Sequence, residues 1–195
     1  MAEFGKQRFP EKYQTSVGMS ARNMLHDNSR ELVGILKENN VIDNKSTVFE
    51  LGSGPARNLH YILKEYPTSK LYCSDLFLQS SFDNMSNEIK EAITFYEGDS
   101  QDIIDNNVIK DLDLFLISDH LMHLQYEKAD YIIKKIISYW KPKHIMLRET
   151  TKEFEMPHVP KLFHDYNQFL IEYDLIEQTI SKQCNAYFIW LLKRK

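Results

Sequence analysis

The chain has 195 residues and a mass of 23.1 kDa, which is enough for one domain with a sizeable core and short for two. Hydrophobic residues make up 43% and charged residues 27% of it, and the net charge of −4 disfavours a nucleic-acid-binding protein, which usually carries a basic surface. Neither a signal peptide nor a run of about 18 apolar residues occurs, so we expect a cytoplasmic protein with no membrane partner.

The pattern from Ser20 to Asn40 is helical, and Asn28 or Ser29 can cap a helix whose apolar positions Leu32, Ile35 and Leu36 fall on one face. After residue 46, short apolar runs alternate with amphipathic segments, which is typical of parallel strands joined by helices. Strands are predicted at 47–51, 71–74, 93–96, 112–117 and 144–147. Helices are predicted at 57–66, across about 78–92, from about 100, at 126–140 and near 160–172.

The C-terminal part of the chain has a different pattern. Two strand-like runs, 175–181 and 186–193, are separated by a short turn that leaves no room for a helix. Such a pair predicts an antiparallel hairpin next to the parallel strands. The sequence therefore predicts a three-layer α/β domain whose mostly parallel, seven-stranded sheet ends in an antiparallel hairpin.

Four successive predicted strands end in polar or acidic residues. These ends are Glu50-Leu51-Gly52, Ser74-Asp75, Glu97-Gly98-Asp99 and Ser118-Asp119. Ligands of parallel α/β sheets bind at the carboxyl ends of the strands, so we expect a site there. Two glycines in the first turn let a ligand approach the backbone, and the acid before them favours a ligand with positive charge or free hydroxyls over a pyrophosphate.

With these residues, the chain from about residue 30 to 195 resembles the class I S-adenosylmethionine-dependent methyltransferases, which have a Rossmann-like fold. The family's first motif, an acid two residues before a glycine-rich turn, is matched by Glu50-Leu51-Gly52-Ser53-Gly54. Asp75 matches the acid that holds the ribose hydroxyls, and Asp99 matches the acid near the adenine amino group. The run from Ser118 to Leu124 matches the family's motif at the fourth strand, and the predicted terminal hairpin is a hallmark of the family. Ala56 departs from the pattern, because the family often has a third glycine there.

The resemblance implies S-adenosyl-L-methionine as the cofactor. The cofactor-binding residues that it implies are Glu50, Gly52, Ser53, Gly54, Asp75, Leu76, Asp99, Ser100 and Ser118.

Candidate catalytic residues lie near the ends of the fourth and fifth strands. Methyl transfer needs an aligned acceptor and, for some acceptors, a base for its proton. We expect His120 and His123 in this role because histidine titrates near neutral pH, with Asp119 and Glu149 as further candidate bases. The alternative for both histidines is a structural role. The histidines show no metal-ligand spacing, and the two cysteines form no metal knuckle, so we expect no metal.

The function predicted from the sequence is transfer of a methyl group to an N or O nucleophile, with a small molecule as the partner. The prediction treats residues 1–195 as one methyltransferase domain, with 1–40 as an N-terminal lid or helical segment that includes Tyr13 and 46–195 as the core. A homodimer through the terminal hairpin is an accompanying hypothesis. The alternatives are a catalytically silent S-adenosylmethionine-binding regulator or subunit and a nicotinamide-dependent oxidoreductase.

Overall fold

The computed structural model describes residues 19–67, 69–76, 87–106, 109–150, 162, 164–182 and 186–195, with side chains from residue 27 onward. Tyr13 of the predicted lid, Cys184 and residues 78–86 of a predicted helix lie outside the described residues. Among the described helices, none is both long and apolar enough to cross a membrane.

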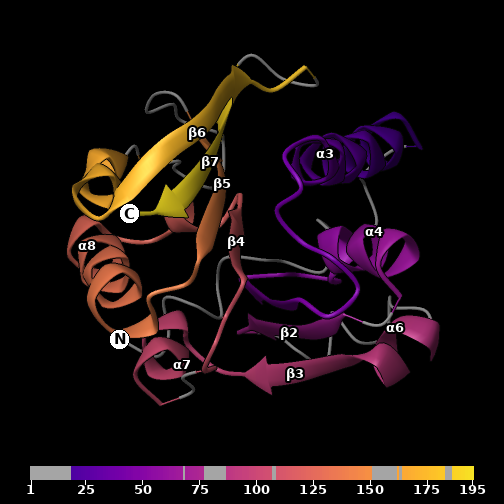
Figure 1. Cartoon of the computed structure of the whole chain (residues 1–195), viewed down its shortest axis with the longest axis horizontal. Coiled ribbons are helices and arrows are strands. Elements are labelled where there is room, and N and C mark those ends of the chain that lie inside the picture. Colours follow the sequence, from indigo (N-terminus) through magenta and orange to yellow (C-terminus); the bar gives the residue numbers. More distant parts are fainter. Residues whose placement is uncertain are drawn as a thin grey trace.

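The described residues form a seven-stranded sheet with the order β3-β2-β1-β4-β5-β7-β6 (Figure 1). Strands β1 to β5 are parallel, and β7 is antiparallel to both of its neighbours. This arrangement confirms the predicted sheet and its terminal hairpin. The strands are β1 (Thr47–Leu51), β2 (Lys70–Asp75), β3 (Ile93–Glu97), β4 (Leu114–Ser118), β5 (His144–Thr150), β6 (Tyr173–Ile180) and β7 (Tyr187–Arg194).

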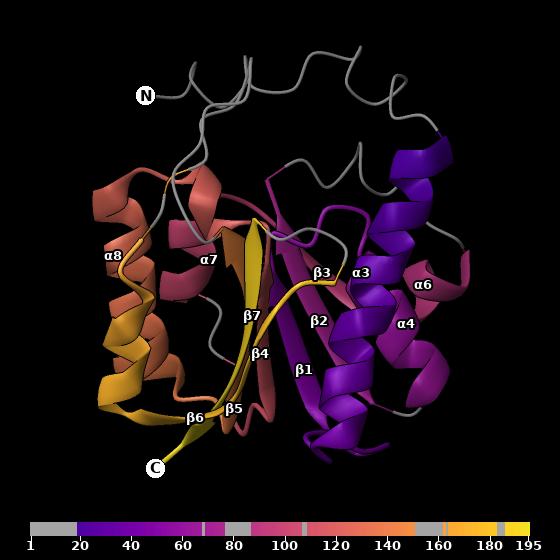
Figure 2. The same ribbon diagram turned by 90° about the horizontal axis from the view of Figure 1, so that it is seen from above.

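Helices cover both faces of the sheet and make the three layers (Figure 2). One face carries α3 (Met19–Glu38), α4 (Arg57–Glu65) and α6 (Asn87–Ala92). The other carries α7 (Ser100–Asn106) and α8 (Tyr126–Lys135), which a π-helical turn (Ile136–Trp140) extends. Two short 3-10 helices, η1 (Leu121–His123) and η3 (Tyr166–Ile171), complete the described elements.

The sheet separates two hydrophobic clusters, because successive side chains of a strand point to opposite faces. On β1, Val48 packs in the cluster beneath α3 and α4, and Phe49 packs in the cluster beneath α7 and α8. Phe49 lies 5.2 Å from the ring of Phe115 and 4.9 Å from that of Trp140, measured between ring centroids. Burial of each such side chain contributes about 1.5–3 kcal/mol, so β1 is anchored from both sides.

The observed elements differ from the predicted ones at two helices. Helix α3 already includes Asn28 and Ser29, so neither is an N-cap, and the hydroxyl of Ser29 instead donates to Asn58 of α4. The helix expected near 160–172 is a 3-10 helix of six residues, capped by Asp165, whose side chain accepts from the backbone N–H of Asn167. The predicted N-cap was therefore wrong, because the helix already begins before these residues and the Ser29 hydroxyl bonds to a neighbouring helix.

Candidate functional site

The turn after β1 is held to the end of β2. Gly52 and Gly54 have φ values of 68° and 51°, a left-handed conformation that favours glycine. The backbone N–H of Ser53 donates to the carbonyl of Ser74 at 2.9 Å, and that of Gly54 donates to Oδ2 of Asp75 at 2.8 Å. The predicted residues of the first and second strand ends are therefore in direct contact.

Glu50 is a buried carboxylate at the end of β1, with 1% of its surface exposed. Its Oε1 accepts from Nδ2 of Asn58 at 2.6 Å, and its Oε2 has no hydrogen-bond partner among the described residues. Burial raises the pKa of Glu50 to about 8, with Asn58 and Arg57 opposing the shift and Asp75 and Asp119 adding to it. An uncompensated carboxylate in this position is suited to a cationic hydrogen-bond donor.

Asp99 and Ser100 begin the helix that follows β3. Oδ1 of Asp99 accepts from the backbone N–H of Gln101 at 2.9 Å, and its Oδ2 forms an ion pair with Lys128. Although burial opposes ionisation, Lys128 and the Gln101 N–H hold the pKa of Asp99 below its ordinary value. The hydroxyl of Ser100 lies 2.7 Å from Nε2 of His120. This contact joins the third and fourth strand ends.

The imidazole ring of His120 packs on the glycine turn. A Cβ added to Gly52 would lie 2.0 Å from Nδ1 of His120. Burial, with a smaller contribution from Lys128, lowers the pKa of His120 to about 4, so the ring is neutral at pH 7. His120 therefore contacts both the turn after β1 and the start of α7.

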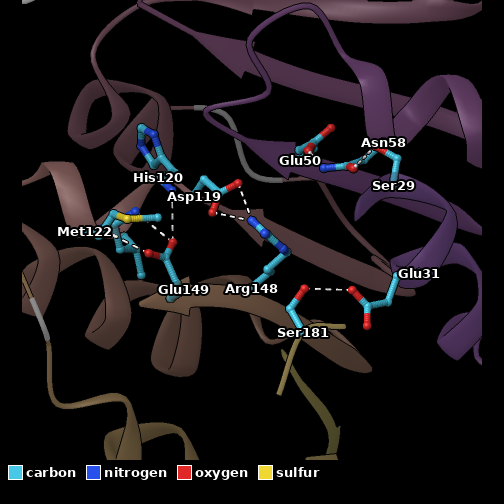
Figure 3. A network of polar contacts seen from close by, with 11 residues as sticks. Ser29, Glu31, Glu50, Asn58, Asp119, His120, Met122, Arg148, Glu149 and Ser181 are labelled. Atoms are coloured by element: carbon cyan, nitrogen blue, oxygen red, sulfur yellow. Dashed lines mark hydrogen bonds and ion pairs between the residues drawn. The ribbon is translucent and has the colours of Figure 1, made fainter. Parts of the chain in front are cut away.

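Two adjacent residues of β5 hold the loop that follows β4 (Figure 3). Arg148, which is 2% exposed, donates from Nη1 to Asp119 and stacks 4.3 Å from the ring centroid of Tyr187. Asp119 itself has a left-handed backbone, with φ of 57°. The guanidinium and this carboxylate therefore fix the first residue of the loop.

Glu149 holds the next three residues of the same loop. Its Oε1 accepts from the backbone N–H groups of His120 and Leu121 at 3.0 and 2.9 Å, and its Oε2 accepts from that of Met122 at 3.1 Å. Burial, and then the charge of Asp119, raise the pKa of Glu149 to about 7. The position of His120 thus depends on a carboxylate 29 residues later in the chain.

The remaining predicted residues lie at the same end of the sheet. Leu76 follows β2 with 44% of its surface exposed, and Ser118 is the last residue of β4. His123 is the last residue of η1, and its backbone N–H donates to the carbonyl of His120 at 3.0 Å. The described residues contain no group of three or more His, Cys, Asp or Glu that could hold a metal ion.

Sequence reasoning did not single out Asn58 and Arg148, which both contact predicted site residues. Asn58 lies in the first turn of α4, directly after the glycine turn, so an amide at this position was a usable signal. Arg148 gave a weaker signal, since a charged residue inside an apolar strand is buried only when it is paired.

Several solved structures with a similar fold are described as methyltransferases, all at low sequence identity. An O-methyltransferase family protein from Burkholderia thailandensis has a TM-score of 0.64 at 15% identity over 96% of this chain, and the chain spans 63% of that protein. Magnesium protoporphyrin IX methyltransferase from Synechocystis PCC 6803, with bound S-adenosylmethionine, has a TM-score of 0.68 at 14% identity, covering 93% of this chain and 85% of its own. A glycopeptide N-methyltransferase complexed with S-adenosylmethionine gives 0.63 at 12% identity, with 87% and 94% covered.

The chain has the fold of the class I S-adenosylmethionine-dependent methyltransferases. No protein-family model and no curated protein matches the sequence.

The residues at the carboxyl ends of the parallel strands fit S-adenosylmethionine. The cofactor carries an ammonium group, and Oε2 of Glu50 is a buried acceptor without a partner among the described residues. The space beside Gly54 is open, because a Cβ added there would meet no atom within 4 Å. These carboxylate acceptors and the open glycine turn thus suit a cation with hydroxyls.

Proposed function

We propose that the chain is an S-adenosylmethionine-dependent methyltransferase that acts on an N or O nucleophile of a small molecule. The observation that carries this proposal is the buried carboxylate of Glu50 directly before a left-handed glycine turn. A dinucleotide would place a pyrophosphate at such a turn, where the ionised form of Glu50 would repel it. The cationic amino-acid end of S-adenosylmethionine would instead supply the missing donor.

Asp75 and Asp99 are the proposed partners of the nucleoside part. Asp75 accepts from the N–H of Gly54, so it both stabilises the turn and presents a carboxylate beside it. Asp99 is held as an ion by Lys128 and directly precedes α7, and Leu76, directly after β2, offers an exposed apolar side chain. The remaining proposed contacts are Gly52, Ser53, Gly54, Ser100 and Ser118.

S-adenosylmethionine supplies a methyl group already activated by the sulfonium, so the chain has to align the acceptor, exclude water and receive the acceptor's proton where there is one. His120 is a neutral ring against the glycine turn, and we assign it to contact with bound ligand. A pKa near 4 makes His120 a weak base, so His123 is the proposed proton acceptor.

Calorimetry with S-adenosylhomocysteine tests the cofactor site. The wild-type chain should bind it, and Asp75→Ala and Gly52→Val should lose that binding, whereas Asp174→Ala, an exposed carboxylate on β6, should not. Unchanged affinity in both site variants would reject the assignment. Methyl-labelled S-adenosylmethionine with cell lysate, followed by mass analysis of the labelled products, would identify the acceptor.

A catalytically silent binding protein is the second candidate. The contacts of three candidate bases favour it: Asp119 is paired with Arg148, Ser100 engages His120, and both oxygens of Glu149 accept backbone N–H groups. Binding of S-adenosylhomocysteine with no turnover of labelled S-adenosylmethionine in lysate would support this candidate against the enzyme.

A further inference from the structure

A chain of two hydrogen bonds links helix α3 to Glu50 (Figure 3). The hydroxyl of Ser29 donates to Oδ1 of Asn58 at 2.6 Å, and Nδ2 of Asn58 donates to Oε1 of Glu50 at 2.6 Å. Ser29 is 2% exposed and Glu50 is 1% exposed. The Ser29 hydroxyl donates to the amide oxygen of Asn58, so the amide nitrogen of Asn58 points at the carboxylate of Glu50.

The bond from Asn58 determines which oxygen of Glu50 is left for a ligand. Oε1 is occupied, and Oε2 has no hydrogen-bond partner among the described residues. The charged and titratable groups facing Glu50 are Arg57, Asp75, Asp119 and the thiol of Cys73. Arg57 attracts the carboxylate and the two aspartates repel it, so a fixed hydrogen bond is needed to hold its orientation.

Helix α3 is itself anchored on its other side. Glu31 accepts from the hydroxyl of Ser181 and from the backbone N–H of Lys182, both at 2.8 Å. These contacts reach the residues that directly follow β6 in the C-terminal hairpin, 150 residues away in the chain. Ser29 therefore projects from a helix that is held against both α4 and the hairpin, which makes it a rigid support for Asn58.

We propose that Ser29 and Asn58 are positioning residues that orient Glu50 so that one of its oxygens faces the ammonium group of the bound cofactor. This inference rests on the proposed function. Neither residue needs to touch the cofactor, and each acts through the carboxylate of Glu50. Helix α3, which matches no motif of the methyltransferases, thereby contributes to cofactor selection.

Two ligands separate this role from a general effect on the fold. S-adenosylhomocysteine carries the ammonium group, and 5′-methylthioadenosine has the same nucleoside without the amino-acid end. Asn58→Leu, which keeps the shape of asparagine, should lower the affinity for S-adenosylhomocysteine about tenfold, because Glu50 ionises when the ammonium binds and its hydrogen bond from Asn58 is stronger in the charged form. Its affinity for 5′-methylthioadenosine should stay within about twofold of wild type, since no net hydrogen bond is lost there.

A matched pair of variants tests Ser29. Ser29→Thr keeps the hydroxyl, and Ser29→Val has nearly the shape of the threonine variant without the hydroxyl. Only the valine variant should therefore lose affinity for S-adenosylhomocysteine. Thermal unfolding of both variants provides the control for folding, because threonine and valine have nearly the same shape and differ in the hydroxyl. In Asn58→Leu, the affinity for S-adenosylhomocysteine should also level off at a higher pH. The reason is that the lost hydrogen bond no longer lowers the pKa of Glu50.

The outcomes distinguish the inference from the function on which it rests. An equal loss of both ligands in Asn58→Leu, or equal affinities of the threonine and valine variants, would overturn the positioning role while leaving the cofactor site in place. If the wild-type chain binds neither ligand, the proposed function fails and the inference fails with it.

Discussion

Gly52 and His120 are packed so closely that a β-carbon on the glycine would lie 2.0 Å from Nδ1 of the imidazole. The turn after β1 and the loop after β4 thus interlock at this point, and glycine is required twice, for its φ of 68° and for the space. Gly54 differs, since its φ is 51° but no atom lies within 4 Å of an added Cβ. The two glycines therefore offer a matched comparison.

Gly52→Ala should destabilise the chain without ligand more than Gly54→Ala does. The Gly54 variant carries only the strain of a left-handed backbone, about 1–2 kcal/mol of folding free energy. The Gly52 variant must also displace His120, so we expect an additional loss of about 1–3 kcal/mol. Urea unfolding without ligand measures both stabilities; equal effects of the two substitutions would contradict the close packing.

Removing the imidazole provides the control for that result. In the double variant Gly52→Ala with His120→Ala, the steric conflict disappears, while the backbone strain and the loss of the imidazole's own contacts remain. The double variant should therefore lose less stability to urea than the sum of the losses in the two single variants. An additive loss of stability would indicate that the ring does not obstruct the alanine.

Substitutions of Glu149 should destabilise the loop after β4 in a fixed order. Glu149→Met leaves the backbone N–H groups of His120, Leu121 and Met122 without their acceptor, which costs about 3 kcal/mol or more. Glu149→Gln keeps one oxygen and leaves one N–H unsatisfied, about 1–3 kcal/mol. Urea unfolding at pH 7 measures the stability of both variants. A methionine variant as stable as the glutamine variant would contradict the role of Glu149 in holding the loop after β4.

The ion pair of Asp119 and Arg148 should contribute more than a surface pair. Arg148 is 2% exposed, so Asp119→Asn leaves a buried guanidinium without its counter-charge, at a cost of about 2–3 kcal/mol. This is below the value for a fully buried pair because the side chain of Asp119 is 33% exposed. Asp130→Asn, which removes an exposed pair with Lys134, is the control and should cost below about 0.5 kcal/mol. Urea unfolding of the two variants decides, and equal costs would refute the assignment.

The parts of the fold that the sequence predicted are those with a local signal. The apolar runs at β1 and β4 and the short turn before β7 predicted strands and hairpin, because burial and chain length act within each segment. The acids Glu50, Asp75 and Asp99 were selected as candidates by a local signal of the same kind, since the strand ends share one edge of a parallel sheet.

The contacts that sequence reasoning missed depend on packing between distant segments. A serine at position 29 is compatible with a helix cap and with a hydrogen bond to Asn58. Only the position of α3 against α4 decides between these two roles. Glu149 was a candidate base by its place at a strand end, and the structure adds that both of its oxygens hold backbone N–H groups. Such roles follow from tertiary contacts, which no periodicity encodes.

The pH dependence of stability should reflect Glu50 and Glu149. Their pKa values in the folded chain are about 8 and about 7, above the ordinary 4.5, so the folded state binds protons more tightly than the unfolded state. Their contribution is complete below pH 4.5 and is lost as the pH rises through the folded pKa values. His120, with its pKa lowered to about 4, opposes this trend only below its ordinary 6.5.

The clean window is therefore pH 6.5 to 8. There, without ligand, the free energy of unfolding should fall with pH, by at most about 1.4 kcal/mol per pH unit for each group. Urea unfolding in this window should show a shallower slope for Glu50→Gln than for wild type. A wild-type stability that rises across the window would contradict the raised pKa values.

Binding of S-adenosylhomocysteine should show the opposite pH dependence. An ammonium beside Glu50 favours its ionised form, so binding releases the proton that the buried carboxyl holds below its pKa of about 8. The affinity should rise between pH 6.5 and 8, by at most about tenfold per pH unit, and calorimetry in buffers of different ionisation enthalpy should detect the released proton. Glu50→Gln should abolish this pH dependence, whereas Asp174→Ala should retain it. A wild-type affinity that does not change with pH would place the ammonium group away from Glu50.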